Sequence, residues 1–300
     1  MQLTASSGVR SRISPTFAAL LLLVGCWGRG IEYEGGTNAS TGTGDGGDGG
    51  DGGTNPTTAP PPVECGDDAD TTTGYRVEGT VSDLETAELL WDGLCVWAID
   101  PTPAVTGGDP LFLSSAEVCD GGEYLIPNIE EVPTIGMFVM VDDCDNDASD
   151  TVMKAATGLS PDEITGLGDG DAVFDHVAEA VSQEYLTLLD SELGVADSLG
   201  VTGFLAGYVV DSSESPVGGA AISCGGCADV YYLDSDPSDG LFMTGGSINT
   251  ETDASAGSFF IIPDAPVFTY EADDGGAHTW APSLFGSIDE YGVFVNFVAD

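Results

Sequence analysis

Two acidic loops carry the residues whose types and spacing best fit metal chemistry. Aspartates stand close together in both: Asp143, Asp145 and Asp147 in the first, and Asp234, Asp236 and Asp239, just before Gly240, in the second. Carboxylate oxygens are the ligands that Ca²⁺ prefers. An EF-hand is not expected, because Ala148 and Lys154 replace its Gly and closing Glu. In a chain this rich in Asp such clusters are expected by chance, so solvated acidic turns and no cofactor are the preferred interpretation, and a calcium site at these loops is the alternative.

The cysteines predict disulfides. The chain has seven cysteines, and one of them, Cys26, follows an apolar run. The other six favour three bridges in an exported chain. Spacing does not fix their connectivity, and the pairing favoured here is Cys65 with Cys144, Cys95 with Cys119, and Cys224 with Cys227. The last pair has redox spacing, but it follows a strand-like segment rather than starting a helix, so a structural bridge is the preferred interpretation.

Histidine chemistry has two candidates, His176 and His278. His176 falls in a pattern that predicts a helix, where a structural role is the better interpretation. His278 lies in an acidic loop and could be a ligand, but one histidine does not make a zinc site. Gly-x-Ser-x-Gly and His-Glu-x-x-His motifs are absent from the sequence. We therefore expect a protein that is not an enzyme.

Aromatic side chains could stack on a glycan, as they do in many β-sandwich binding modules. The candidates are Trp91, Trp97, Trp280, Tyr231 and Tyr232. Trp97 lies in an apolar run and is expected in the core, whereas Trp280, close to Pro282, is expected to be exposed.

The net charge limits the partners. The chain has 51 acidic and 5 basic residues, a formal charge of −46. Nucleic-acid binding depends on Lys and Arg that displace counterions from phosphates, so nucleic acid is excluded as a partner. Self-repulsion at this charge predicts a protein stabilised by salt or divalent cations.

The N-terminal residues predict export and anchoring. Arg10 and Arg12 precede an apolar run over residues 17–24, which is too short to span a bilayer. Leu23-Val24-Gly25-Cys26 then resembles the lipobox of bacterial lipoproteins. The resemblance implies that residues 1–25 are a signal peptide, that Cys26 is lipidated, and that the protein is held at the cell envelope, at the periplasmic or surface face of the outer membrane. An ordinary signal peptide with an incidental cysteine is the alternative.

The remaining chain predicts a mainly β fold. Residues 26–64 are expected to be a disordered tether, because residues 35–62 within them, rich in Gly, Asp, Thr and Pro, offer no apolar side chain to bury. Short alternating strands bounded by turn residues predict antiparallel β-sandwich domains over residues 65–148 and 203–300. Between them, residues 149–202 are expected to be a helical connector. Its predicted helices begin at Ser160, with Glu163 three residues on, and at Asp171, the second ending near Gly194.

The second half of the chain repeats the first. Val77-Glu78-Gly79-Thr80-Val81-Ser82-Asp83 matches residues 205–211, and residues 122–128 match residues 257–264 with one insertion. At Gly207-Tyr208-Val209-Val210-Asp211, Pro216 to Ile222 and Gly257-Ser258-Phe259 the chain resembles the carboxypeptidase regulatory-like family. The resemblance implies a prealbumin-like (Ig-like) β-sandwich and a non-catalytic accessory module.

These observations predict a lipid-anchored envelope protein with a structural or interaction role. Its partners would be the membrane, through the anchor, and an envelope protein or glycan. The alternative is a calcium-dependent or glycan-binding adhesion module. The oligomeric state stays open.

Overall fold

The computed structural model describes residues 60–65, 72–144, 151–195, 197–227, 229–236, 238, 240–244 and 247–299. The expected signal peptide, Cys26 and most of the expected tether therefore lie outside the described residues. Within the described ranges, the helices are too short or too polar to cross a membrane.

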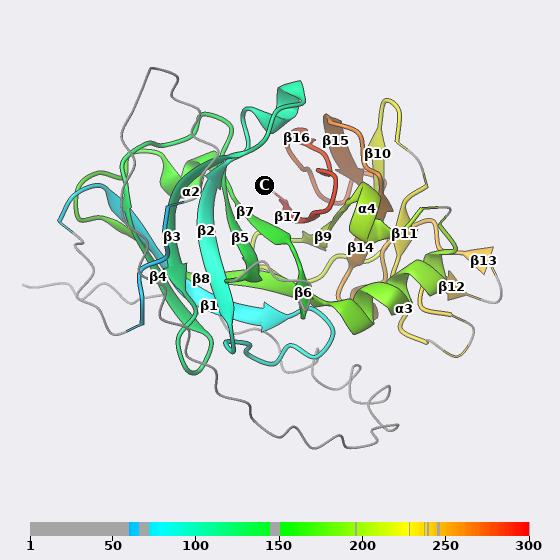
Figure 1. Ribbon diagram of the computed structural model, residues 1–300. Coiled ribbons are helices and arrows are strands. Elements are labelled where there is room, and N and C mark those ends of the chain that lie inside the picture. The colour runs from blue at the N-terminus through cyan, green and yellow to red at the C-terminus, as the bar shows by residue number, and fades with distance from the viewer. Residues whose placement is uncertain are drawn as a thin grey trace, which may run out of the picture.

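The N-terminal half of the described chain is a β-sandwich of two sheets (Figure 1). One sheet has the order β4-β1-β8-β6, and the other contains β7, β5, β2 and β3 side by side. The strands are β1 (Tyr75–Asp83), β2 (Leu94–Asp100), β3 (Leu111–Glu117), β4 (Glu123–Ile129), β5 (Met137–Asp143), β6 (Val152–Met153), β7 (Ala155–Leu159) and β8 (Ala172–Ser182). Side chains from both sheets, among them Val77, Val96, Ile126 and Val139, form the first core between them.

The C-terminal half repeats this plan. Its larger strands are β9 (Phe204–Val210), β10 (Ala221–Cys224), β14 (Phe259–Pro263), β15 (Phe268–Asp273), β16 (Ser283–Phe285) and β17 (Gly292–Val298). Shorter strands are β11 (Tyr231–Tyr232), β12 (Met243–Thr244) and β13 (Ser247–Ile248). A three-stranded sheet, β10-β15-β16, packs on β14, β9 and β17 across the second core, which includes Leu205, Phe260, Tyr270 and Phe297. The expectation of a mainly β protein is confirmed.

One sheet crosses the predicted boundary between the halves. Strand β17 pairs in parallel with β9 on one side and with β7 on the other, so eight strands run in the order β11-β14-β9-β17-β7-β5-β2-β3. In Figure 1 the green strands of the N-terminal half meet the red C-terminal strand at this seam. The two halves are therefore joined by backbone hydrogen bonds as well as by side-chain packing.

The prediction of a helical connector over residues 149–202 is wrong in its larger part. Residues 172–182 form β8 instead of a helix, and only α3 (Gln183–Leu193) and the short α2 (Pro161–Ile164) and α4 (Leu199–Thr202) are helical. The four-residue spacing of Val173, Val177 and Val181 fits a strand as well as a helix, because four is also a multiple of the strand period. Valine's β-branched side chain and the pairing of β8 with β1 favour the strand.

The predicted helix start at Ser160 and the predicted stop near Gly194 are correct, whereas the predicted start at Asp171 is wrong. The Ser160 N–H donates to the Glu163 carboxylate at 2.6 Å at the start of α2. Helix α3 starts later than predicted, with Ser182 as its cap, and ends at Gly194 in the left-handed conformation (φ 60°).

The sequence repeat corresponds to a structural repeat. β1 pairs antiparallel with β4 and parallel with β8, and β9 pairs antiparallel with β14 and parallel with β17. Gly79 and Gly207 occupy matching positions, opposite His176 and Val295. A Cβ at either glycine would collide with the carbonyl oxygen of its partner, so the close approach of the parallel strands requires glycine at both places.

The disulfides are Cys65–Cys119, Cys95–Cys144 and Cys224–Cys227. The expected pairs Cys65–Cys144 and Cys95–Cys119 are wrong, whereas Cys224–Cys227 is as expected. Cys144 follows β5 directly, and β5 pairs with β2 so that Leu94 lies opposite Asp143. This register brings Cys95 and Cys144 together and leaves Cys119, at the end of β3, for Cys65.

Candidate functional site

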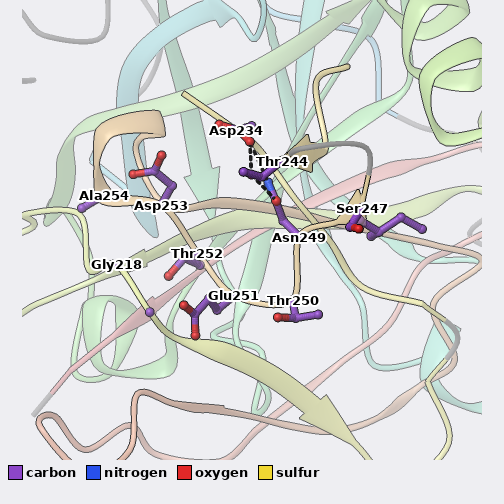
Figure 2. A pocket seen from close by; sticks show the side chains of 12 residues that line it. Gly218, Asp234, Thr244, Ser247, Asn249, Thr250, Glu251, Thr252, Asp253 and Ala254 are labelled. Atoms are coloured by element: carbon purple, nitrogen blue, oxygen red, sulfur yellow. Dashed lines mark hydrogen bonds between the residues drawn. The ribbon is translucent and has the colours of Figure 1, made fainter. Parts of the chain in front are cut away.

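The C-terminal half contains a polar cavity of about 570 Å³ (Figure 2). Its walls come from β12, β13, the segment 249–254 and the turn at Gly218 and Gly219. Most of the side chains that line it carry oxygen: Asp234, Thr244, Ser247, Asn249, Thr250, Glu251, Thr252 and Asp253. Lys and Arg are absent from its lining, so the cavity suits cations and neutral ligands rich in hydroxyl groups.

The centre of the cavity is a hydrogen-bonded group of three side chains. The Thr244 hydroxyl lies against the Asp234 carboxylate and 2.7 Å from Asn249 Oδ1. Asn249 Nδ2 donates to the Tyr232 carbonyl at 3.2 Å and approaches Asp234 Oδ2 at 3.5 Å. The backbone N–H of Asp236 donates to the other Asp234 oxygen at 2.9 Å. These contacts fix the orientation of the Asp234 carboxylate, which is 7% exposed as a residue.

Two of the carboxylates that line the cavity, Asp234 and Asp253, are held in the charged form. Burial opposes the ionisation of Asp234, but hydrogen bonds from Thr244, the Asp236 N–H and Asn249 outweigh it and lower the pKa of Asp234. In the same way, hydrogen bonds from Ser235 and Ser255 outweigh burial and lower the pKa of Asp253. The cavity is therefore anionic at neutral pH.

Three of the six predicted calcium residues, Asp143, Asp234 and Asp236, are among the described residues. Asp234 lines the cavity, Asp236 contacts Asp234 through its backbone N–H without lining the cavity, and Asp239 lies outside the described residues. Asp143 is buried and accepts from the Thr151 N–H at 2.7 Å, and Asp145 and Asp147 are again outside the described residues. Across the described ranges, no three His, Cys, Asp or Glu side chains are grouped so that they could hold a metal ion.

The sequence interpretation missed the cavity's other polar residues. Thr244 is the last residue of β12, and Asn249 directly follows β13. Both contact Asp234 only because the β12–β13 hairpin folds back toward it. The polar run Asn249-Thr250-Glu251-Thr252-Asp253 between apolar strands was the available signal.

The histidines lie apart from the cavity lining. His278 Nδ1 is 2.6 Å from the Asp274 carboxylate, and hydrogen bonds from the His278 ring and backbone lower the pKa of Asp274 to about 2. His176 lies on β8 rather than on a helix, and its Nε2 is buried without a hydrogen-bond partner among the described residues. Burial lowers the pKa of His176 to about 4, so the ring is neutral at neutral pH.

The aromatic candidates for glycan stacking are mostly buried. Trp280, expected on the surface, is 7% exposed because it packs into the second core, where its Nε1 donates to the Val210 carbonyl at 3.4 Å. Trp97 is in the core as expected. Trp91 is 44% exposed but is not among the residues that line the polar cavity.

Comparisons with known proteins give distant structural similarities. No family model and no curated protein matches the sequence. Among solved structures, the chain is similar to the Bacillus anthracis TIE protein, with 12% identity over 76% of this chain and 34% of that one, and a TM-score of 0.23. It is also similar to the shaft pilin SpaA from Lactobacillus rhamnosus GG (11% identity, 76% of this chain, 98% of that one, TM-score 0.24). A third match is a streptococcal ancillary pilin, with 12% identity over 76% of this chain and 63% of that one, and a TM-score of 0.22.

The chain spans about a third of the length of the TIE protein. TM-scores this low establish neither a common fold nor a common function.

Proposed function

We propose that the chain is a lipid-anchored protein of the cell envelope with a non-catalytic structural or interaction role. In this proposal residues 1–25 are removed as a signal peptide, Cys26 carries the lipid, and the expected tether of residues 26–64 ends earlier, at residue 59, because residues 60–64 contact β3. Residues 65–148 together with β6, β7 and β8, and residues 203–300, act as two carboxypeptidase regulatory-like sandwich units, and α3 and α4 connect them. The membrane is reached through the anchor, and an envelope protein or glycan is the further partner.

The way the chain enters the body is the observation that supports this proposal. Val63 pairs in parallel with Ala116 of the edge strand β3: its N–H donates to the Ser115 carbonyl at 3.3 Å, and its carbonyl accepts from the Glu117 N–H at 2.9 Å. The Ser115 hydroxyl donates to the Pro60 carbonyl at 2.9 Å, and the Cys65–Cys119 disulfide closes this contact. We call residues 60–65 with this disulfide the entry clamp.

The entry clamp suits a protein held from its N-terminal side. A pull on residue 60 would act on the β3 edge and then on a covalent bond, so the large sheet would stay intact under load. The disulfides themselves favour an oxidising compartment outside the cytoplasm.

The anchor is tested by replacing Cys26 with Ser in the full-length chain expressed in a Gram-negative bacterium. We expect the wild type to enter the detergent phase of a Triton X-114 separation and Cys26→Ser to remain in the aqueous phase. The matched control is the Cys224→Ser/Cys227→Ser double variant, which keeps Cys26 and should partition like the wild type. Unchanged partition of Cys26→Ser would overturn the proposal.

A calcium- or glycan-binding role is the second candidate function, and the polar cavity favours it. The fixed Asp234 carboxylate, Asn249 and the hydroxyls around them offer oxygen ligands to Ca²⁺ or hydrogen bonds to sugar hydroxyls. Titration calorimetry with Ca²⁺, and a glycan array, would be run on the wild type, Asp234→Asn and the control Asp236→Asn, whose side chain does not line the cavity. Binding lost in Asp234→Asn alone supports this role, and no binding by the wild type dismisses it.

A further inference from the structure

The Cys224–Cys227 disulfide differs from the other two in its place in the fold. We propose that it is a site of thiol–disulfide exchange that reacts with small cationic thiols while the rest of the protein stays folded. The exchange needs an external thiol, and the product is a mixed disulfide or a reduced cysteine pair on β10.

The pair is at the rim of the second core. Cys224 is the last residue of β10, where it lies opposite Tyr270 of β15, and Cys227 follows after two exposed glycines. Both cysteines are partly buried and pack against the second core from outside. The exposed Gly225-Gly226 turn leaves one side of the disulfide open to solvent, which in-line attack by a thiol requires.

The fold depends little on this bridge. It joins residues 3 positions apart, whereas the other bridges join residues 54 and 49 apart. The stabilisation that a disulfide gives by restricting the unfolded chain grows with the loop it closes, so the shortest loop contributes least. β10 is also held independently, through its four-residue pairing with β15 and through the Ile222 N–H, which donates to the Tyr232 hydroxyl at 2.6 Å.

The other two bridges are tied into larger parts of the structure. Cys95, the second residue of β2, is fully buried, and its partner Cys144 is exposed directly after β5. Cys65, although exposed, is part of the entry clamp, and its N–H donates to the Glu117 carboxylate at 3.3 Å. Each of these bridges joins segments far apart in the sequence, so its loss would release more of the chain than loss of Cys224–Cys227.

The charges around Cys224 determine which external thiols reach the disulfide most readily. Glu271 lies opposite Ser223 and Asp273 opposite Ala221, both with exposed side chains. The basic residues beyond the first 25 positions are Arg29, Arg76 and Lys154, and the two in the described ranges lie on β1 and next to β7, away from β10. An anionic thiolate is therefore repelled, and a thiol that carries an ammonium group is attracted.

The exchange balances without a further oxidant. A thiolate RS⁻ attacks one sulfur, the bond between the cysteines breaks, and the departing cysteine leaves as a thiolate that takes up a proton. A second RS⁻ attacks the mixed disulfide, forms RSSR and frees the other cysteine. Two electrons pass from two RSH to the protein disulfide, and the reverse sequence reoxidises the pair.

The test treats the folded full-length chain with 2-aminoethanethiol or 3-mercaptopropionate at equal thiolate concentration and low salt. Free cysteines are then alkylated and located by peptide mapping, while circular dichroism follows the fold. We expect Cys224 and Cys227 to be labelled at a thiol concentration at least about tenfold below that needed for the other four, with an unchanged spectrum. The cationic thiol should react several-fold faster than the anionic one, and 0.5 M NaCl should remove most of the difference.

Two variants serve as controls. Glu271→Gln should narrow the preference for the cationic thiol, and Cys224→Ser/Cys227→Ser should fold and leave the other four cysteines protected. The proposal fails if Cys65–Cys119 is reduced first or at the same thiol concentration. It also fails if the double variant does not fold, since the bridge would then be structural.

Discussion

Two ionisable side chains on β8, His176 and Glu179, are partly buried, and their pKa values are shifted in opposite directions. Burial lowers the pKa of His176 from 6.5 to about 4. Burial, and to a lesser degree the charge of Asp83, raises the pKa of Glu179 from 4.5 to about 7. Each group is therefore neutral over a pH range in which its unfolded counterpart is charged.

The signs of the two contributions follow from proton uptake. Below pH 6.5 the unfolded chain protonates His176 and the folded chain does not, so this contribution to stability is lost as pH falls toward 4. Above pH 4.5 the unfolded chain ionises Glu179 while the folded chain keeps its proton, so that contribution is lost as pH rises toward 7. Each is about 3 kcal/mol at full extent, and the two oppose each other between pH 4.5 and 6.5.

We predict that Glu179→Gln raises the free energy of unfolding at pH 7.5 by up to about 3 kcal/mol and changes it little at pH 4. His176→Leu should show the reverse, with its largest gain over the wild type near pH 4. Urea denaturation from pH 4 to 8 measures both, with exposed Glu130→Gln as the control. Parallel profiles for all three variants would contradict the prediction.

We predict that Gly79→Ala and Gly207→Ala each lower the free energy of unfolding by about 3 kcal/mol or more, since the new methyl group meets the carbonyl of the neighbouring parallel strand. Gly225→Ala, which has open space around its Cβ position, is the matched control and should change stability by less than about 0.5 kcal/mol. Equal losses in all three variants would show that strand spacing is not the cause.

At the scale of elements, the entry clamp is the connection between the body and whatever precedes residue 60. We predict that Cys65→Ser/Cys119→Ser lowers the free energy of unfolding by about 2–4 kcal/mol and makes the bonds near residues 60–65 sensitive to protease in the folded protein. Urea denaturation and limited proteolysis measure these effects. The Cys224→Ser/Cys227→Ser variant removes a bridge that closes a much shorter loop, so its free energy of unfolding should fall by less. A larger fall in that variant would contradict the explanation.

The elements also show how far local sequence signals reach. The alternation from Tyr75 to Val81, the capping box at Ser160 and the stop at Gly194 are local, and the structure has each where expected. The strand β8 was predicted as a helix because its period is ambiguous, and its partner β1 is far away in the sequence. For the same reason Asp234 could be singled out, but its contacts with Thr244 and Asn249 could not.

Disulfide pairing depends on register rather than on spacing. Cys95 meets Cys144 because β2 and β5 pair with Leu94 opposite Asp143. A sequence without aligned strands offers no such information. The short Cys224–Cys227 bridge is the exception, because only two glycines separate its cysteines and each is therefore the nearest partner of the other along the chain.

At the scale of the whole molecule, the large excess of negative over positive charge is the main electrostatic effect. The chain has a formal charge of −46, and the described residues contain two ion pairs, Arg76 with Glu78 and His278 with Asp274. Repulsion between carboxylates therefore opposes the compact state. We predict that the melting temperature rises by several degrees between 10 mM and 0.5 M NaCl and rises further with Mg²⁺. Differential scanning fluorimetry measures this, and a melting temperature independent of salt would contradict it.

The seam strand β17 also governs how fast the native state can form. Its two neighbours, β9 and β7, belong to different halves of the chain, and both pair with it in parallel. Such pairing can stabilise the chain only after very long loops have closed, at a cost in chain entropy. The protein is therefore expected to fold slowly. Newly made molecules would therefore wait with two unpaired sheet edges, a period in which a chaperone would have most to protect.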